Sequence, residues 1–448
     1  MDAVYNLSFL TIVAAAGDNA NAGLSPYKCL RLNPNVPFHV ETISGNNFVT
    51  SLSPKIAAEV ITKSKWATRG WTLQEYVLSK RAVVFTGQYV FFRCEEGLWA
   101  EDFGLNLSSF SDSWPGWDLP LYRFSQASKS VLRHYGNYPL LVAQYVRRDL
   151  TKEGDVLNAF LGILSRLEDV IGTHFWGLPS KQFGSALLWS TDMSFPIKRI
   201  SSFPSWSWAG WIHTSTVPRQ PVNYERPIQD DMYMHQEYDS WHIRSLLTCY
   251  KIEDDGKIQC FEKADIDPFI SIRNRAIQNG KIPSSSVLSI NRTINKHLTP
   301  PYNHEDILNL YVSAKERSGP LASHYVFSWT SCGTLYVDRR PKDDRGDDLR
   351  IKKFAVRTEP NSSFPVGFVR LDYEWREKQP DMLEFAVTTV GLVFDFLHRH
   401  INLGLVLITS SCDSMPKAYT RVTVLEARID QESWVNSARP EQRLVALI

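Results

Sequence analysis

The most constraining feature of the chain is an apolar run close to its start, residues 7–15 in "LSFLTIVAAAG". A run of this kind, closed by Gly17, is typical of a central strand in a parallel sheet, which is buried on both faces. Such a strand needs neighbours on both edges to satisfy its backbone groups. No earlier element is available to pair with it, so we expect the chain to start inside a domain whose first strands are missing.

The remainder of residues 1–105 has α/β character. Residues 54–65 carry apolar side chains at the spacing of a short amphipathic helix. A second helix is expected to follow, with Thr68 as its cap and its end near Leu78. The segment "AVVFTGQYVFF" then predicts two strands joined at Thr86-Gly87-Gln88 as a hairpin.

The pattern becomes helical over residues 106–200 and β-like over residues 201–448. The best helix carries apolar residues at positions i, i+3, i+4 and i+7, namely Leu157, Phe160, Leu161 and Leu164. Weaker helical patterns are "PLLVAQYVRRDL" and "SKQFGSALLWS". The β-like runs predict an antiparallel β-rich region; they are "SWSWAGW", "SHYVFSWTS", "GTLYVDR", "VGFVRLDYEW", "LVLITSS" and "YTRVTVLEARI".

Composition excludes several classes of function. The chain has 49 Lys and Arg residues and 48 Asp and Glu residues, so it lacks the excess of positive charge typical of nucleic-acid binding proteins. Its 448 residues, 43% of them hydrophobic, are enough for more than one domain. The six cysteines are dispersed, which favours reduced thiols and a cytoplasmic protein without zinc. The apolar segments are too short or too charged to span a membrane. His398 and His400 have no third ligand nearby in sequence, so no metal is expected.

The short motifs resemble one family. The segments "AVYNLSFLTIVAAAGDNANAGLSP", "WATRGWTLQEYVLSKRAVVFT" with "VFFRC", and "FPSWSWAGW" resemble the fungal heterokaryon incompatibility (HET) domain proteins, in the same order and over roughly residues 1–211. Arg69 to Glu75 is the most distinctive block. The family's earlier Ser-Tyr-x-Trp-Gly strand and Cys-Ile segment are absent before Ala3, which agrees with an N-terminally truncated HET domain.

The resemblance implies a fold and a chemistry. HET domains are thought to be remote relatives of TIR domains, which are flavodoxin-like folds and some of which cleave NAD. In their nucleotide-cleaving members a glutamate follows a tryptophan on a helix, and Trp71 to Glu75 has that spacing, with Thr72 at the position of a cysteine. Because residues four apart share a helix face, Trp71 would shield Glu75 at a cleft wall. Glu75 would then stabilise positive charge as nicotinamide leaves, with NAD as substrate and no bound cofactor.

A structural role is the alternative for each candidate. Trp-x-x-x-Glu is common on helices, where tryptophan packs and glutamate favours the helix. Arg69 is expected to bind phosphate or a carboxylate, or to form an ion pair within the protein. Gln74 either binds ligand or is solvated on the helix surface, and Gly70 allows close approach of another backbone or a ligand.

The tryptophans of "SWSWAGW" favour packing over ligand binding. Trp206 and Trp208 are expected on one face of a strand, followed by Trp211. Large aromatic side chains at such spacing more often fill a core or a contact between domains than stack on a ligand.

Three functions remain open from the sequence. The first is an allorecognition and programmed cell death effector of heterokaryon incompatibility, whose TIR-like domain cleaves NAD in its intact form. The second is a non-catalytic interaction module. The third is an inactive fragment of a HET protein. By analogy with TIR-like domains, the expected partner is a second copy of the chain or another HET- or NLR-type signalling protein.

Overall fold

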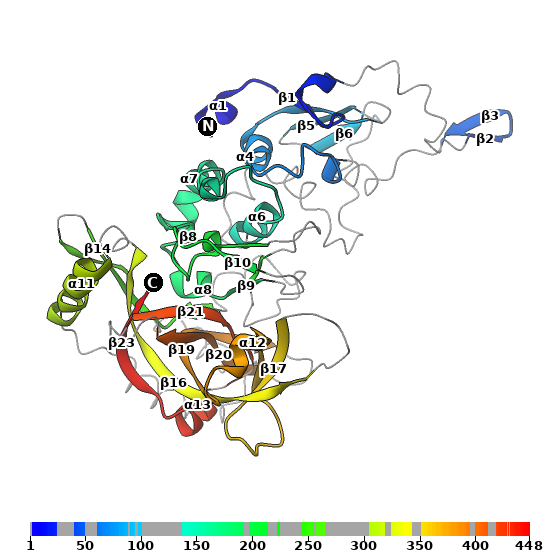
Figure 1. Ribbon diagram of the computed structural model, residues 1–448. Helices are drawn as coiled ribbons and strands as arrows, with labels where there is room; N and C mark the ends of the chain where they lie inside the picture. The colour runs from blue at the N-terminus through cyan, green and yellow to red at the C-terminus, as the bar shows by residue number, and fades with distance from the viewer. Residues whose placement is uncertain are drawn as a thin grey trace, which may run out of the picture. The chain divides into compact units, whose positions relative to one another are not determined.

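The computed structural model places most elements of the chain in two compact units, Met1–Gly172 and Thr173–Ile448. The residues described are 2–24, 40–49, 61–87, 90–94, 97–100, 137–191, 197–213, 222–224, 243–253, 256–264, 304–318, 324–342, 351–394, 399–410, 418–427, 429 and 431–448. Each unit has its own sheet, and each is described by itself (Figure 1). The predicted division of the chain at residues 105 and 200 remains a prediction.

The first unit is built on a four-stranded sheet with the order β1-β4-β5-β6. Strand β1 pairs in parallel with β4, and β4, β5 and β6 follow as an antiparallel meander. The hairpin predicted around Thr86 is therefore present as β4 and β5. The strands are β1 (Thr11–Ala14), β4 (Ala82–Phe85), β5 (Val90–Cys94) and β6 (Gly97–Ala100).

A strand forms within residues 7–15, but it is not buried on both faces as predicted. Residues 2–7 form helix α1 (Asp2–Leu7), and β1 pairs in parallel with β4 within the described part of the chain. Side chains of β1 alternate between the two faces of the sheet: Val13 is 2% exposed, whereas Ile12 is 60% exposed. One face of the strand therefore packs on the core and the other stays exposed, although the run is apolar at nearly every position.

The described part of the first unit holds three further helices: α4 (Trp71–Leu78), α6 (Asn137–Tyr145) and α7 (Leu161–Ile171). Helix α1 packs against α4 and α7, and these two pack against each other (Figure 1). Helix α7 is amphipathic as predicted, but its buried face differs from the predicted one in part. Phe160 and Leu164 are buried, whereas Leu161 is half-buried and Leu157 lies in the preceding turns. The helix predicted over residues 54–65 falls mostly outside the described residues.

Helix α4 ends at Leu78 as predicted, but Thr68 is not its cap. The N-cap position is Gly70, and the Thr68 hydroxyl donates backward to the carbonyl of Lys65 at 2.9 Å. At the other end of α4, the buried guanidinium of Arg93 on β5 donates to the carbonyls of Tyr76 and Ser79. A cation at this end satisfies carbonyls that have no partner within the helix and complements the helix dipole.

The second unit is dominated by an 11-stranded sheet, which confirms the β-rich character expected after residue 200. Part of this sheet closes on itself as a ring. Strand β16 pairs with β17, β17 with β18, and β18 with β22, which follows β21 along the chain. Strand β21 pairs with β20, β20 with β19, and β19 pairs again with β16. The ring strands are β16 (Val326–Pro341), β17 (Ile351–Arg357), β18 (Gly367–Asp372), β19 (Met382–Phe394), β20 (Arg399–Ser410), β21 (Ala418–Val424) and β22 (Glu426–Ala427).

Alternate residues of these strands fill the ring with apolar side chains. Among those buried together are Leu335, Val337, Phe354, Val356, Val369, Leu371, Leu383, Phe385, Leu405 and Leu407. Closure removes free strand edges, and the interior of a ring this small is filled by side chains alone. Helix α13 (Gln431–Ser437) adds Trp434 to the same core.

Other strands and one helix extend the second unit. Helix α11 (His304–Ser318) contributes Ile307 to a second apolar cluster with residues of β14, β16 and β23. These strands and their neighbours are β13 (Ile243–Ser245), β14 (Thr248–Ile252), β15 (Ile258–Glu262) and β23 (Glu441–Leu447). The shorter elements are η1 (Ala20–Ala22), β2 (Val40–Ile43), β3 (Asn46–Val49), η4 (Glu153–Asp155), β7 (His174–Phe175), β8 (Leu178–Pro179), α8 (Phe183–Ala186), β9 (Trp189–Thr191), β10 (Ile197–Arg199), η5 (Trp208–Gly210), β11 (Trp211–His213), β12 (Val222–Tyr224) and α12 (Tyr373–Glu377).

Several predicted strands differ in detail. "SHYVFSWTS" and "GTLYVDR" belong to the single long strand β16, and "VGFVRLDYEW" divides into β18 and α12. The division occurs because the Asp372 carboxylate accepts the backbone N–H of Trp375 at 2.9 Å and caps a new helix. The strand predicted for "SWSWAGW" does not form: Trp206 lies in a turn, Trp208 begins η5, and only Trp211 belongs to a strand, β11.

Candidate functional site

Helix α4 positions the predicted site, and two local features fix where it begins. The Thr72 hydroxyl lies 2.7 Å from the carbonyls of both Trp66 and Arg69, which ties the first turn to the preceding segment. A Cβ added at Gly70 would lie 2.5 Å from Cδ2 of Leu150, and the Gly70 N–H donates to the carbonyl of Asp149 at 2.8 Å. The close approach predicted at Gly70 is therefore made by the segment that follows α6.

Glu75 lies on the second turn of α4 and is partly buried. Its negative charge acts on the phenol of Tyr5, which lies on α1. The pKa of Tyr5 is raised to about 12, first by burial and then by the negative charge of Glu75. The phenol of Tyr5 is therefore neutral at neutral pH.

Arg148 supplies positive charge near the same carboxylate. Its guanidinium is 6% exposed, and Nη1 donates to the Thr72 hydroxyl at 2.9 Å and to the carbonyl of Arg69 at 3.3 Å. Burial lowers the pKa of Arg148 to about 10, while the charges of Tyr145 and Glu75 act in the opposite direction. A guanidinium with a pKa of 10 still carries its charge at neutral pH, so Glu75 has a cationic neighbour.

A chain of hydroxyl groups joins the backbone of α1 to the backbone of α4. Ser8 Oγ lies 2.8 Å from the carbonyl of Tyr5 and 3.1 Å from Thr11 Oγ1, which lies 2.6 Å from Ser79 Oγ. Ser79 Oγ in turn donates to the carbonyl of Glu75 at 2.6 Å. These hydrogen bonds connect the backbone of Tyr5 with the backbone of Glu75.

The other predicted site residues on α4 and just before it differ in how far their side chains are exposed. The side chain of Arg69 is exposed, and its backbone carbonyl accepts hydrogen bonds from the Thr72 hydroxyl and the Arg148 guanidinium. Gln74 is 1% exposed, so solvation on the helix surface is wrong for it; within the described structure its Nε2 has no hydrogen-bond partner. Trp71 is half-buried, and its shielding of Glu75 stays a prediction.

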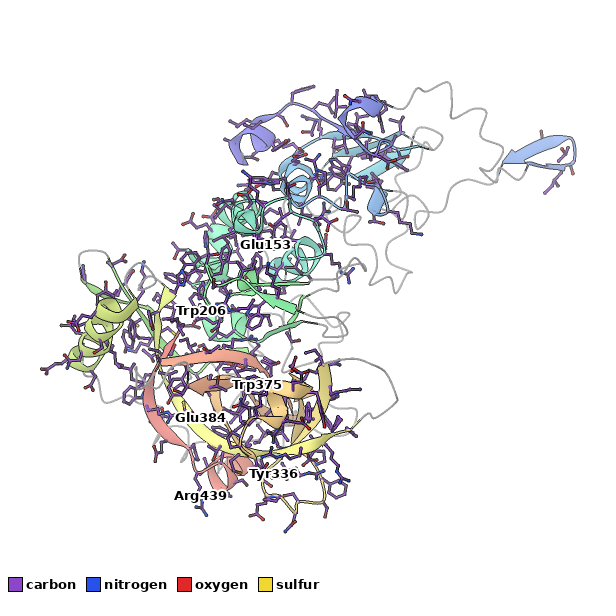
Figure 2. The ribbon with its side chains drawn as sticks, viewed as in Figure 1. Glu153, Trp206, Tyr336, Trp375, Glu384 and Arg439 are labelled. Carbon is purple, nitrogen blue, oxygen red and sulfur yellow. The ribbon has the colours of Figure 1, made fainter. Side chains whose placement is uncertain are left out.

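The tryptophans of "SWSWAGW" serve packing in the second unit. Trp206 is fully buried, its Nε1 donates to the carbonyl of His324 at 3.0 Å, and its ring meets that of Phe183 edge-on (Figure 2). Trp208 is 1% exposed, and Trp211 Nε1 donates to the carbonyl of Ser205 at 2.9 Å. This segment therefore belongs to the core of the second unit, as its composition favoured.

The remaining predictions concern metals and membranes. The side chains of His398 and His400 lie outside the described residues. In the part of the chain that is described, no cluster of His, Cys, Asp and Glu side chains is suited to hold a metal ion. The same residues contain no helix that is long and apolar enough to cross a membrane.

Sequence reasoning missed Tyr5 and Arg148, the two neighbours of Glu75. Tyr5 stands in an apolar stretch and Arg148 in "VRRDL", so neither has a local pattern that signals a site. Glu75 is thus a half-buried carboxylate whose charge acts on the phenol of Tyr5 and on the guanidinium of Arg148. A carboxylate in this position can accept hydrogen bonds from hydroxyl groups of a ligand and stabilise a developing positive charge.

Comparison with known families supports the motif-based resemblance. Residues 1–75 match the family model of the heterokaryon incompatibility protein (HET), from the start of the chain to Glu75. The match confirms the HET resemblance for this segment, which contains α1, β1 and most of α4, and is consistent with a HET domain protein. It supports involvement in heterokaryon incompatibility at the level of the family. No curated protein and no solved structure gives a significant match.

Proposed function

We propose that the chain acts in fungal heterokaryon incompatibility by cleaving NAD, with Glu75 as the catalytic carboxylate. The observation that carries the proposal is the position of Glu75: it ends the HET match, is half-buried, and lies where its charge acts on Tyr5 and Arg148. The flavodoxin- or TIR-like character of the domain is part of this proposal, and the parallel pair β1–β4 supports it.

The chemistry requires little of the protein beyond charge and orientation. The bond between C1′ of the ribose and the nicotinamide nitrogen breaks, and its electron pair neutralises the pyridinium. Positive charge develops on the ribose, which the Glu75 carboxylate stabilises while accepting hydrogen bonds from ribose hydroxyls. Water then adds at C1′ and releases a proton, giving ADP-ribose and nicotinamide. Loss of cellular NAD by this reaction would account for cell death.

The test is nicotinamide release from NAD by the purified full chain, with Glu75→Gln as the inactive variant. Removing the carboxylate charge should lower the rate by roughly 100-fold or more. The matched control is Glu153→Gln, which neutralises an exposed glutamate of the same unit (Figure 2) and should leave the rate unchanged. An absence of nicotinamide release by the wild-type chain, or equal rates for wild type and Glu75→Gln, would overturn the catalytic proposal.

A second function is favoured by a different observation, the exposed apolar side chains from the end of α1 into β1. Leu7 is 77% exposed, Phe9 81% and Ile12 60%. Apolar side chains gathered at the surface are typical of protein contact sites. They support a non-catalytic interaction module that associates with another copy or with another HET- or NLR-type protein. A folded chain that does not cleave NAD, yet self-associates in a manner abolished by Phe9→Ser, would favour this function.

A further inference from the structure

We infer that the outer side of strand β1 binds a second copy of the chain, by antiparallel pairing of β1 with the β1 of that copy. The inference deepens the interaction module proposed above and does not depend on NAD cleavage. Three features of β1 support it: the direction of its backbone groups, the apolar side chains beside them, and the charges at its two ends.

The backbone of β1 directs hydrogen-bonding groups away from β4. The N–H groups of Thr11 and Ala15 donate to carbonyls on the β4 side at 2.9 and 2.8 Å. Because successive residues of a strand direct these groups to opposite sides, the N–H and C=O of Ile12 and Ala14 point away from β4. Strand β1 ends the order of its sheet, and among the described residues no strand pairs with its outer side.

Two outer sides of this kind are complementary when the strands run antiparallel. In a two-fold arrangement centred on Val13, Ile12 of each copy lies opposite Ala14 of the other. Both pairs are then of the hydrogen-bonded kind, in which each residue donates its N–H and accepts at its C=O, so the contact supplies about four backbone hydrogen bonds. The contact uses the same strand of both copies, so it closes with two copies and joins their sheets into one.

Exposed apolar side chains accompany these backbone groups. Phe9, Leu10 and Ile12 are 81%, 40% and 60% exposed, and Ile12 shares the exposed face of the strand with Ala14. When two copies of β1 pair, Ile12 of one copy comes beside Ala14 of the other on this face, and part of the apolar surface leaves water. An open strand edge with apolar side chains is a typical site of pairing between chains.

Opposite charges at the two ends of β1 favour a second copy in the antiparallel direction. Lys80 and Arg81 adjoin the start of the strand, where the carbonyl of Arg81 accepts the N–H of Thr11. Asp18 follows the end of the strand, and all three charged side chains are exposed. Antiparallel pairing brings the start of one strand to the end of the other, so the basic pair of each copy approaches Asp18 of the other. This charge complementarity is what a second copy offers and a merely apolar partner does not.

Sedimentation velocity of the full chain over a range of concentrations measures the association. Wild type should form a dimer and no larger species. Ala14→Pro removes an outward N–H twice in each dimer and leaves the groups that pair with β4 intact, so the Kd should rise at least about 10-fold. Phe9→Ser should also weaken the dimer, whereas its matched control Phe364→Ser, at a phenylalanine 83% exposed in the second unit, should leave the Kd unchanged. Thermal unfolding of each variant separates these effects from loss of fold.

Charge reversal tests the direction of pairing without altering the strand. Arg81→Glu alone and Asp18→Lys alone should each raise the Kd about 3- to 10-fold at low salt, because each brings like charges together at both ends of the contact. The double variant restores opposite charges and should return the Kd to near the wild-type value. Single variants that bind as tightly as wild type would overturn the antiparallel pairing.

Amide hydrogen exchange locates the contact on the strand. The amides of Ile12 and Ala14 should exchange more slowly as the concentration of dimer rises, whereas those of Thr11 and Ala15 should be protected in the monomer already. Protection of Ile12 and Ala14 in the monomer would show that this side is covered within one chain, and it would overturn the inference. A wild type that stays monomeric also overturns it, while association with a different protein would still support the interaction module. A dimer that Ala14→Pro does not weaken retains self-association but rejects this contact.

Discussion

Glu262 is a buried carboxyl group whose ionisation should destabilise the second unit at alkaline pH. It lies at the end of β15 with 8% of its surface exposed, and its carboxylate accepts the backbone N–H of Gly184 at 3.1 Å. Burial raises its pKa to about 8, although hydrogen bonds from Ser245, Gly184 and Phe183 act in the opposite direction. Desolvation therefore outweighs the hydrogen bonds that favour the charge.

The magnitude follows from linkage between protonation and folding. The ordinary pKa is 4.5 and the folded value about 8, so the folded state holds a proton that the unfolded chain releases. This contribution to stability is complete below pH 4.5 and is lost as the pH rises through about 8. The total is about 5 kcal/mol, or roughly 1.4 kcal/mol for each pH unit within that window.

The measurement is urea unfolding of the full chain from pH 5 to pH 9, followed by tryptophan fluorescence. Glu262→Gln does not titrate, and its amide oxygen still accepts the Gly184 N–H. The unfolding free energy of wild type minus that of the variant should fall steadily up to pH 8 and level off above it. Glu359→Gln, at an exposed glutamate, should follow wild type. Parallel pH curves for wild type and Glu262→Gln would refute the reasoning.

Two further predictions concern the core of the second unit. Trp206→Phe removes the donor to the carbonyl of His324 but leaves that carbonyl buried, so the free energy of unfolding in urea should fall by about 1–3 kcal/mol. An unchanged unfolding midpoint would contradict this role. Gly333→Ala would place a Cβ 2.8 Å from the backbone oxygen of Ala438, so we expect a loss of about 1–3 kcal/mol in the same assay, and equal or greater stability would show that the strand can shift without cost.

Local sequence was sufficient for features that depend on neighbours along the chain. The end of α4 at Leu78, the amphipathic face of α7 and the hairpin of β4 and β5 all follow from spacing and turn residues. The HET motif could be recognised from the sequence for the same reason, because its distinctive block is a continuous segment that ends at Glu75.

Features that depend on distant pairing were decided by the tertiary structure. An apolar run does not show which of its faces will be covered, so the exposed face of β1 was known only from the tertiary structure. The closed ring of the second unit could not be predicted for the same reason. The surroundings of Glu75 also escaped prediction: Tyr5 and Arg148 have ordinary local patterns, and the packing of α1 and of the segment after α6 against α4 brings them into the neighbourhood of this carboxylate.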